Sequence, residues 1–148
     1  MIVLDTNVLS ELVRRNPEPS VIAWLDGVPG RDLATTAVTA AELFHGVERL
    51  APGKRRTALR EALHALLHED LRGRVEPFDA VAAEEYALVV RAREAAGMSV
   101  SVPDAQIAAV CRALGATLAT RNVKDFVRTG IALIDPWSLP AGGTPTPD

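Results

Sequence analysis

The sequence of 148 residues contains a single cysteine, Cys111. One thiol cannot form an internal disulfide, and it cannot supply a zinc site built from cysteines. Such cysteine usage is typical of a reducing compartment. Phosphate-binding loops of the types Gly-x-x-x-x-Gly-Lys and Gly-x-Gly-x-x-Gly are also missing, so nothing in the sequence supports a nucleotide cofactor.

Long apolar runs and a strong net charge are absent as well. No apolar stretch approaches the ~20 residues that span a bilayer, and the start of the chain, Met1 to Asp5, lacks the basic and apolar regions of a signal peptide. The 16 basic and 19 acidic residues leave a formal net charge of -3. We therefore expect a cytoplasmic protein with no membrane association, in which nucleic-acid binding would need a local basic patch or a bridging metal.

Short apolar segments alternate with helical patterns along the chain. The expected strands are residues 2–4, 33–36, 75–78, 117–120 and 131–134. Between them, the pattern predicts helices that include one beginning at Thr39 and one over residues 54–71. This alternation indicates an α/β protein, a three-layer α/β/α sandwich around a mainly parallel sheet. We expect one domain over residues 1–139 and a disordered tail over residues 140–148, which are rich in Pro and Gly.

Four polar stretches stand where strands end or helices begin. Asp5 directly follows the first strand, Glu42 lies about one turn into a helix, Asp104 is near the start of another helix, and Thr120 ends a strand. In an open parallel sheet, ligands bind outside the carboxyl ends of the strands. The four stretches can therefore meet at one edge of the sheet.

Each stretch also has a purely structural interpretation. Asp5 is a possible N-cap, Thr39 and Glu42 match a capping box, and Asp104 suits the positive end of a helix dipole. Asn122 could likewise cap the turn that follows it. Independent caps, however, would not need to share one edge of a sheet, and this joint arrangement favours a functional site.

Carboxylates gathered at one place need a compensating charge. Two unit charges ~4 Å apart interact by about 4 kcal/mol at an effective dielectric constant near 20, so either some carboxyls stay protonated or a cation lies between them. Mg²⁺ binds one or two carboxylates and keeps several waters, and Mn²⁺ accepts the same oxygen ligands. Zinc fits poorly, because the cluster offers neither His nor Cys. His64 and His68 are spaced i, i+4 but lack the His-Glu-x-x-His pattern of a metalloprotease, and His45, one turn after Glu42, could line the same rim.

Taken in order, four motifs resemble those of PIN-domain proteins, and in particular of VapC-type and FitB-like toxins. The motifs are Met1–Leu12, Thr39–Val47, Pro103–Ala109 and Leu118–Phe126, and the stretch from Asp135 to Pro140 is similar to the ending of these toxins. The resemblance covers the chain to about Pro140. It implies a PIN-like sandwich with the activity of a Mg²⁺- or Mn²⁺-dependent endoribonuclease. It also implies a toxin that pairs with a cognate antitoxin protein and forms a homodimer.

The resemblance also implies roles for individual residues. The first three acidic positions of the family fall on Asp5, Glu42 and Asp104, as metal ligands and catalytic acids. The family usually has a further acid where this chain has Asn122. Either Asp125 substitutes for it, or Asn122 binds the metal or a water through its carbonyl oxygen.

Two further groups of residues are expected around these acids. The residues expected to hydrogen-bond the carboxylates, or merely to act as caps, are Thr6, Asn7, Thr120 and Asn122. The residues expected to bind RNA are Arg14, Arg15 and Arg121, with Lys54, Arg55 and Arg56 as further candidates. The alternative for the last three is a solvated helix start.

Two other functions remain open on the sequence. A phosphatase or phosphotransferase of the haloacid-dehalogenase type would use Asp5 as its nucleophile, but it wants a second Asp where this chain has Asn7. A metal-free RNA-binding protein would not need the set of Asp5, Glu42 and Asp104.

Overall fold

The computed structural model describes residues 1–139, and the expected tail at 140–148 lies outside the described residues. Its centre is a sheet of five strands in the order β3-β2-β1-β4-β5. Every neighbouring pair of strands is parallel. The strands are β1 (Ile2–Leu4), β2 (Leu33–Thr36), β3 (Val75–Glu76), β4 (Thr117–Ala119) and β5 (Leu133–Ile134).

The order of the strands creates a switch point at β1. The chain passes from β1 to β2 and β3 on one side, and then returns to β4 and β5 on the other side. In open parallel sheets, the crevice at such a reversal lies outside the carboxyl ends of the strands and is the usual place for a ligand. The sheet order therefore places the crevice between the ends of β1 and β4.

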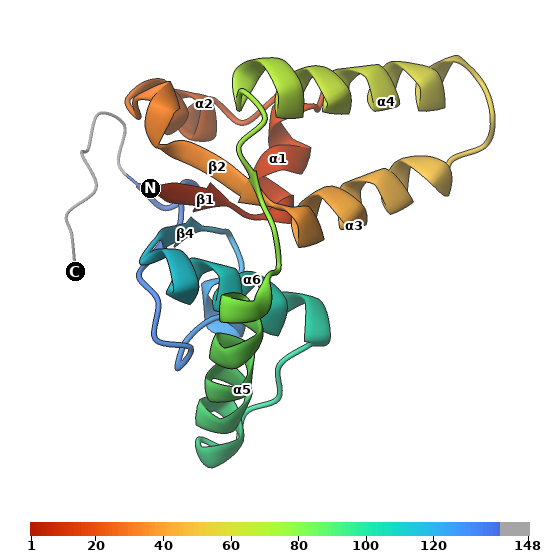
Figure 1. Ribbon diagram of the computed structural model, residues 1–148. Helices are drawn as coiled ribbons and strands as arrows, with labels where there is room; N and C mark the ends of the chain where they lie inside the picture. The colour runs from red at the N-terminus through yellow and green to blue at the C-terminus, as the bar shows by residue number, and fades with distance from the viewer. Residues whose placement is uncertain (140–148) are drawn as a thin grey trace.

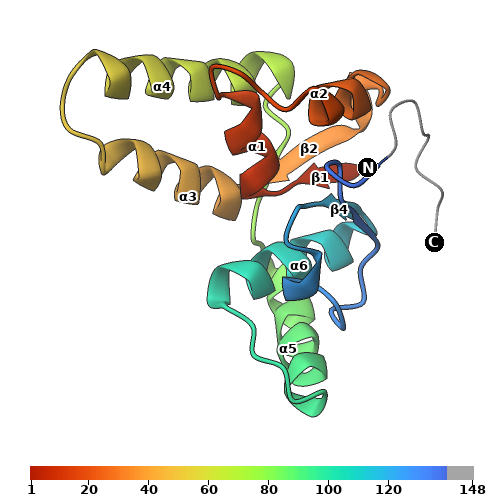
Figure 2. The same cartoon turned by 180° about the vertical axis from the view of Figure 1, so that it is seen from behind.

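Helices cover both faces of the sheet, as Figures 1 and 2 show. One face carries α1 (Thr6–Leu12), α2 (Pro19–Asp26), α3 (Ala37–Glu48) and α4 (Lys54–Ala65), and the other carries α5 (Ala80–Ala95) and α6 (Val102–Leu114). The prediction of a three-layer α/β/α sandwich with a parallel sheet is confirmed. No helix within residues 1–139 has the length and apolar character needed to cross a membrane.

Each face of the sheet has its own hydrophobic core, because successive side chains of a strand point to opposite faces. Leu4 and Ala119 pack with the helices α1 to α4. Their neighbours Val3 and Leu118 pack with α5 and α6. All four side chains are fully buried, as expected for a strand that is covered on both faces.

The third helix begins earlier than the sequence pattern predicts. The hydroxyl of Thr36 accepts a hydrogen bond from the Thr39 amide at 3.0 Å, so Thr36 is the N-cap and Thr39 lies inside the helix. The capping-box interpretation of Thr39 and Glu42 is therefore wrong. The reason is that Thr36, at the end of β2, presents the same chemistry three residues earlier.

The predicted helix over residues 54–71 also differs from the structure. The α-helix ends at Ala65, and Leu66–Asp70 form one π-helical turn. The Leu71 amide donates to the Leu66 carbonyl at 2.9 Å, which is the i to i+5 pattern of such a turn. This wider turn leaves Leu66, Leu67 and Leu71 all buried in the same core.

The last strand is shorter than the predicted 131–134. Only Leu133–Ile134 pair as β5, while Ile131 packs against the core beneath α5 and α6. The Ala132 carbonyl still accepts a hydrogen bond from the Leu118 amide at 2.9 Å, so the segment already pairs with β4 one residue before β5 begins.

Candidate functional site

A hollow of ≈ 440 Å³ opens at the carboxyl ends of β1 and β4. Its lining is mostly polar and acidic and comes from segments far apart in the sequence. The lining residues are Asp5, Thr6, Asn7, Ser10, Glu11, Glu42, Asp104, Arg121, Asn122 and Trp137. The fold thus brings Asp5, Glu42 and Asp104 to one place, at the switch point of the sheet.

Asp5 lies at the floor of this hollow. It is 4% exposed, and its Oδ1 accepts the Thr6 amide at 2.8 Å, so it is also the N-cap of α1. Its Oδ2 accepts the Thr120 hydroxyl at 2.8 Å. Burial raises the pKa of Asp5, and the charge of Asp104 adds to the rise, while the hydrogen bonds from Thr120 and Thr6 lower it. The Asp5 side chain therefore both caps α1 and belongs to the acidic site.

The Thr120 hydroxyl holds three groups of the site together. Its oxygen accepts the Asn122 amide at 3.1 Å and the Asn7 Nδ2 at 3.3 Å. A hydroxyl has two lone pairs and one hydrogen, so with both lone pairs used, its hydrogen points to Asp5. The Asn7 Oδ1 in turn accepts the Arg121 amide at 3.2 Å. This network ties the end of β4 to the start of α1 and makes Asp5 a hydrogen-bond acceptor at both oxygens.

Glu42 and Asp104 reach the hollow from the helices on opposite faces of the sheet. The Thr6 hydroxyl lies 3.4 Å from the Glu42 Oε1 and donates to it. Partial burial, followed by the charges of Asp5 and Asp104, raises the pKa of Glu42. Burial also raises the pKa of Asp104, and the charge of Asp125 adds to it, against the opposing effects of Ser101 and Arg93. The charge of Asp104 thus raises the pKa of both Asp5 and Glu42, as expected for carboxylates at a shared site.

The candidates for a fourth site residue differ in position. Asn122 lines the hollow. Asp125 is not among the lining residues, although its charge acts on Asp104 from the 3₁₀ turn Val123–Asp125. The choice between them stays a prediction.

The predicted RNA-binding arginines separate into two places. Arg121 lines the acidic hollow, and its guanidinium lies 5.1 Å from the centre of the Trp137 ring. Arg14 and Arg15 line a different hollow between α1 and α4, together with Arg55. Arg14 forms an ion pair at 2.9 Å with Glu11, which lines the acidic hollow. Among Arg14, Arg15 and Arg121, Arg121 is therefore the one that lines the acidic hollow, while Arg14 is paired with Glu11.

Three lining residues were missed by the sequence argument. Ser10 and Glu11 lie four residues after Thr6 and Asn7, so the helical period of α1 already places them on the same face. Glu11 is 5% exposed, and its Oε1 accepts the Glu18 amide at 2.8 Å. The hydrogen bond from Arg14 lowers the pKa of Glu11. No local pattern identifies Trp137, because its position depends on β5 lying next to β4.

The histidines are absent from the residues that line the hollow. His64 and His68 stack on α4 with their ring centres 5.7 Å apart, and the Phe44 ring lies 5.0 Å from His64. Their contacts are those of packed aromatic rings.

The chemistry of the hollow fits a hard divalent cation. Its donors are carboxylate, amide and hydroxyl oxygens, and its acids are mutually destabilised by their charges. Within residues 1–139, however, no three Asp, Glu, His or Cys side chains converge closely enough to enclose a metal ion by themselves. A metal at this site would therefore be held by one or two of the carboxylates and by waters, as Mg²⁺ and Mn²⁺ can be.

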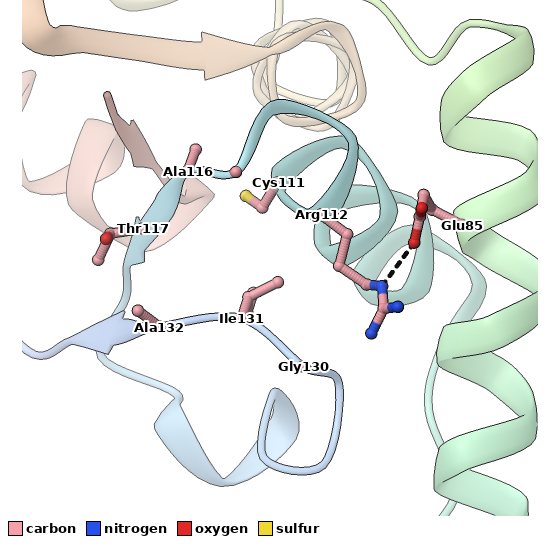
Figure 3. Close-up of a pocket in the computed structure, with 9 residues that line it drawn as sticks. Glu85, Cys111, Arg112, Ala116, Thr117, Gly130, Ile131 and Ala132 are labelled. Atoms are coloured by element: carbon pink, nitrogen blue, oxygen red, sulfur yellow. Dashed lines mark hydrogen bonds and ion pairs between the residues drawn. The ribbon is translucent and has the colours of Figure 1, made fainter. Parts of the chain in front are cut away.

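A second cavity of ≈ 310 Å³ lies at the opposite edge of the sheet, near the starts of β4 and β5 (Figure 3). Its polar feature is the ion pair between Arg112 Nε and Glu85 Oε2 at 2.7 Å. Arg112 Nη1 also donates to the Thr129 carbonyl at 3.1 Å. These contacts brace α5, α6 and the loop before β5, and the cavity holds no cluster of acids.

Comparisons with known proteins agree with this geometry. The family model described as PIN domain matches residues 2–132. The VapC ribonuclease Y4jK of Sinorhizobium fredii is 39% identical over 137 residues, covering 93% of this chain and 98% of that protein. Toxin FitB of Neisseria gonorrhoeae is 37% identical over 137 residues, covering 93% of this chain and 99% of that protein.

A solved structure gives the same result for the fold. The crystal structure of FitAcB from Neisseria gonorrhoeae superimposes with a TM-score of 0.87 at 37% sequence identity, covering 94% of this chain and 100% of that chain. The family model spans most of the sequence, and the relatives match along nearly their whole lengths. The chain therefore belongs to the PIN-domain family, and within it to the group of VapC and FitB.

Proposed function

We propose that this chain is a Mg²⁺- or Mn²⁺-dependent endoribonuclease, and that it acts as the toxin of a toxin–antitoxin pair. The observation that carries the proposal is the convergence of Asp5, Glu42 and Asp104 in one hollow at the switch point of the sheet. Relatives named a VapC ribonuclease and a toxin support it, because they match 93% of this chain.

Each side chain of the hollow has a proposed role in holding the metal or the substrate. Asp5 and Asp104 would hold the metal, directly or through water, and Glu42 at the rim would complete the site or orient the attacking water. A metal bound there lowers the pKa of its water and stabilises the charge that develops on the phosphate. Thr120 keeps Asp5 oriented by donating to its Oδ2. Arg121 would bind the RNA backbone beside the acids.

RNA cleavage by the purified chain tests the chemistry. We expect cleavage with Mg²⁺ or Mn²⁺ and none with EDTA. Asp5→Asn and Asp104→Asn should each lose activity by orders of magnitude, while Asp26→Asn, an exposed aspartate at the end of α2, should retain it. If the wild-type chain cleaves no RNA with either metal, the proposal is refuted. A covalent aspartyl-phosphate trapped on Asp5 would instead establish the phosphatase alternative.

The biological role needs a cellular test. Expression of the chain alone should arrest bacterial growth, and co-expression of a cognate antitoxin protein should restore it. Asp5→Ala should abolish the arrest, because it removes the buried carboxylate of the site. Equal toxicity of the wild type and this variant would show that the arrest does not depend on the acidic hollow.

Three further proposals follow from the same family relationship. The protein is expected to act in the cytoplasm, where its RNA substrate lies, and to form a homodimer. Sedimentation or light scattering of the purified chain tests the dimer directly. The fourth site residue is tested by comparing Asn122→Ala with Asp125→Asn in the cleavage assay: the larger loss identifies the residue that serves the metal or its waters.

A further inference from the structure

The pairing of Arg121 with Trp137 gives the acidic hollow a feature that the metal chemistry does not use. A phosphodiester anion that approaches the carboxylates of the hollow is repelled by each of them. Positive charge from a protein side chain therefore favours substrate binding, in addition to the charge of a bound metal. Among the described residues that line the hollow, Arg121 is the only basic one.

The charge of Arg121 is available for this purpose. Burial is the largest cause of the raised pKa of Asp5, Glu42 and Asp104, and Arg121 is not among the causes for any of the three. Its charge contributes instead to lowering the pKa of Glu11, where the hydrogen bond from Arg14 has the larger effect. Arg121 makes no ion pair within the described residues.

Trp137 fixes the position of this otherwise free side chain. The backbone of Arg121 is held by its amide bond to Asn7, but an exposed arginine side chain samples many rotamers. Its guanidinium lies 5.1 Å from the centre of the Trp137 ring, which is within the range of a cation–π contact. The contact holds the cation at the hollow and reduces the rotamer entropy that Arg121 loses when it binds a phosphate.

Trp137 is itself held firmly. Its amide donates to the Asp135 Oδ1 at 2.9 Å, and the Ser138 amide donates to the Asp135 carbonyl at 3.2 Å. Its ring is partly buried and packs against the core beneath α1 to α4. The turn that carries it follows β5, so the adjacency of β5 and β4 places the ring beside Arg121.

We propose that Trp137 is a positioning residue that holds the Arg121 guanidinium over the acidic hollow, where Arg121 binds a backbone phosphate of the RNA substrate. The inference rests on the proposed ribonuclease function for the identity of the substrate. It predicts that Trp137 affects RNA binding only through Arg121.

The test is a double-mutant cycle on binding, measured without cleavage. A short, fluorescently labelled, single-stranded oligoribonucleotide is titrated with protein in EDTA, and its anisotropy gives the Kd. Arg121→Ala should raise the Kd roughly 10-fold, the loss of one charged hydrogen-bonding contact. Trp137→Leu should raise it about 2- to 5-fold, which corresponds to an exposed cation–π contact, and Trp137→Phe should retain most of the wild-type affinity.

The decisive measurement is the double variant. Arg121→Ala with Trp137→Leu should bind no more weakly than Arg121→Ala alone, because Trp137 has no other route to the RNA. Equal and independent losses in the cycle would overturn the inference. Arg121→Ala should also reduce the slope of log Kd against log salt by ~0.7, the value for one phosphate contact on a single strand. Arg31→Ala, which removes an exposed charge just before β2, is the matched control and should change neither quantity.

The outcome does not depend on catalysis. If Trp137→Leu fails to fold, the same cycle with Trp137→Phe decides the question, since its smaller effect should also vanish in the Arg121→Ala background. If the wild type binds the oligonucleotide and Arg121→Ala binds it equally well, the inference is wrong even where RNA cleavage is observed. If binding depends on Arg121 and Trp137 as stated but no cleavage occurs, the inference stands and the proposed nuclease function fails.

Discussion

Replacing Thr120 by valine removes a single oxygen from the floor of the hollow and keeps the shape of the side chain. Thr120 is fully buried, and its hydroxyl donates to the Asp5 carboxylate at 2.8 Å. A hydrogen bond to a charged group contributes about 1.5–3 kcal/mol. The same change leaves the Asn122 amide and the Asn7 Nδ2 without their acceptor, for which we add roughly 1 kcal/mol because water in the open hollow replaces part of the loss. We expect Thr120→Val to lower the free energy of unfolding by about 2–4 kcal/mol.

Thr35→Val provides a matched control on β2, which lies on the other side of β1 from β4. Thr35 is also fully buried, and its hydroxyl donates to a neutral acceptor, the Leu4 carbonyl, at 2.8 Å. The loss of this bond should lower the free energy of unfolding by about 1 kcal/mol. Urea unfolding followed by circular dichroism, with EDTA present, gives both values from the shift in midpoint at constant slope. Cleavage of RNA should fall in Thr120→Val and stay near the wild-type rate in Thr35→Val.

Thr120→Val and Thr35→Val should also differ in how their destabilisation depends on pH. The pKa of Asp5 is raised on folding above its ordinary value of 3.8. Asp5 therefore favours the folded state most below pH 3.8, and this contribution is lost as the pH rises through the folded pKa. Thr120→Val removes the largest opposing effect, so the folded pKa of Asp5 rises further. Its destabilisation should be full at neutral pH and shrink as the pH falls and Asp5 becomes protonated.

Two results would refute this reasoning. Equal destabilisation by Thr120→Val and Thr35→Val at neutral pH would mean that the Thr120 hydroxyl does not stabilise a charged carboxylate. A loss in Thr120→Val that does not change between neutral pH and about pH 4 would mean that Asp5 is not the group to which it is coupled.

Three other predictions concern the second cavity, the lone thiol and the metal. Gly130→Ala should lower the free energy of unfolding by about 1–2 kcal/mol because of its positive φ of 81°, and by about 1 kcal/mol more because the new Cβ would overlap Arg112 Nη1. Gly97→Ala, at φ 68° with open space around it, should show only the first loss, so equal losses of the two variants in urea unfolding would contradict this prediction. Burial raises the pKa of the Cys111 thiol to about 12, so iodoacetamide should modify it slowly in the native protein and rapidly in urea, whereas fast native labelling would show that the core opens readily. Mn²⁺ at ten times its Kd should raise the Tm of the wild type by about 3–6 °C and that of Asp104→Asn by much less, as scanning calorimetry would show; an equal rise in both would place the metal elsewhere.

The sequence by itself determined the fold class and three of the four acids that line the hollow, Asp5, Glu42 and Asp104. Short apolar runs fix buried strands because both faces of a parallel sheet are covered, and Asp5 must follow β1 because the run ends there. Glu42 and Asp104 could be assigned because each lies near a helix start that follows from the same alternation of strands and helices, Asp104 in the first turn of α6 and Glu42 in the second turn of α3. These are local patterns, and local patterns are readable in a single sequence.

The tertiary structure alone decided which residues accompany those acids. The capping-box interpretation of Thr39 failed because the hydroxyl of Thr36 competes for the same amide. Arg14 is engaged by Glu11 and faces another hollow, although its sequence context is as basic as that of Arg121. Trp137 reaches the site only because β5 pairs with β4. Contacts of this kind join residues on different strands and helices, and they depend on the order in which the strands pair, which no local pattern encodes.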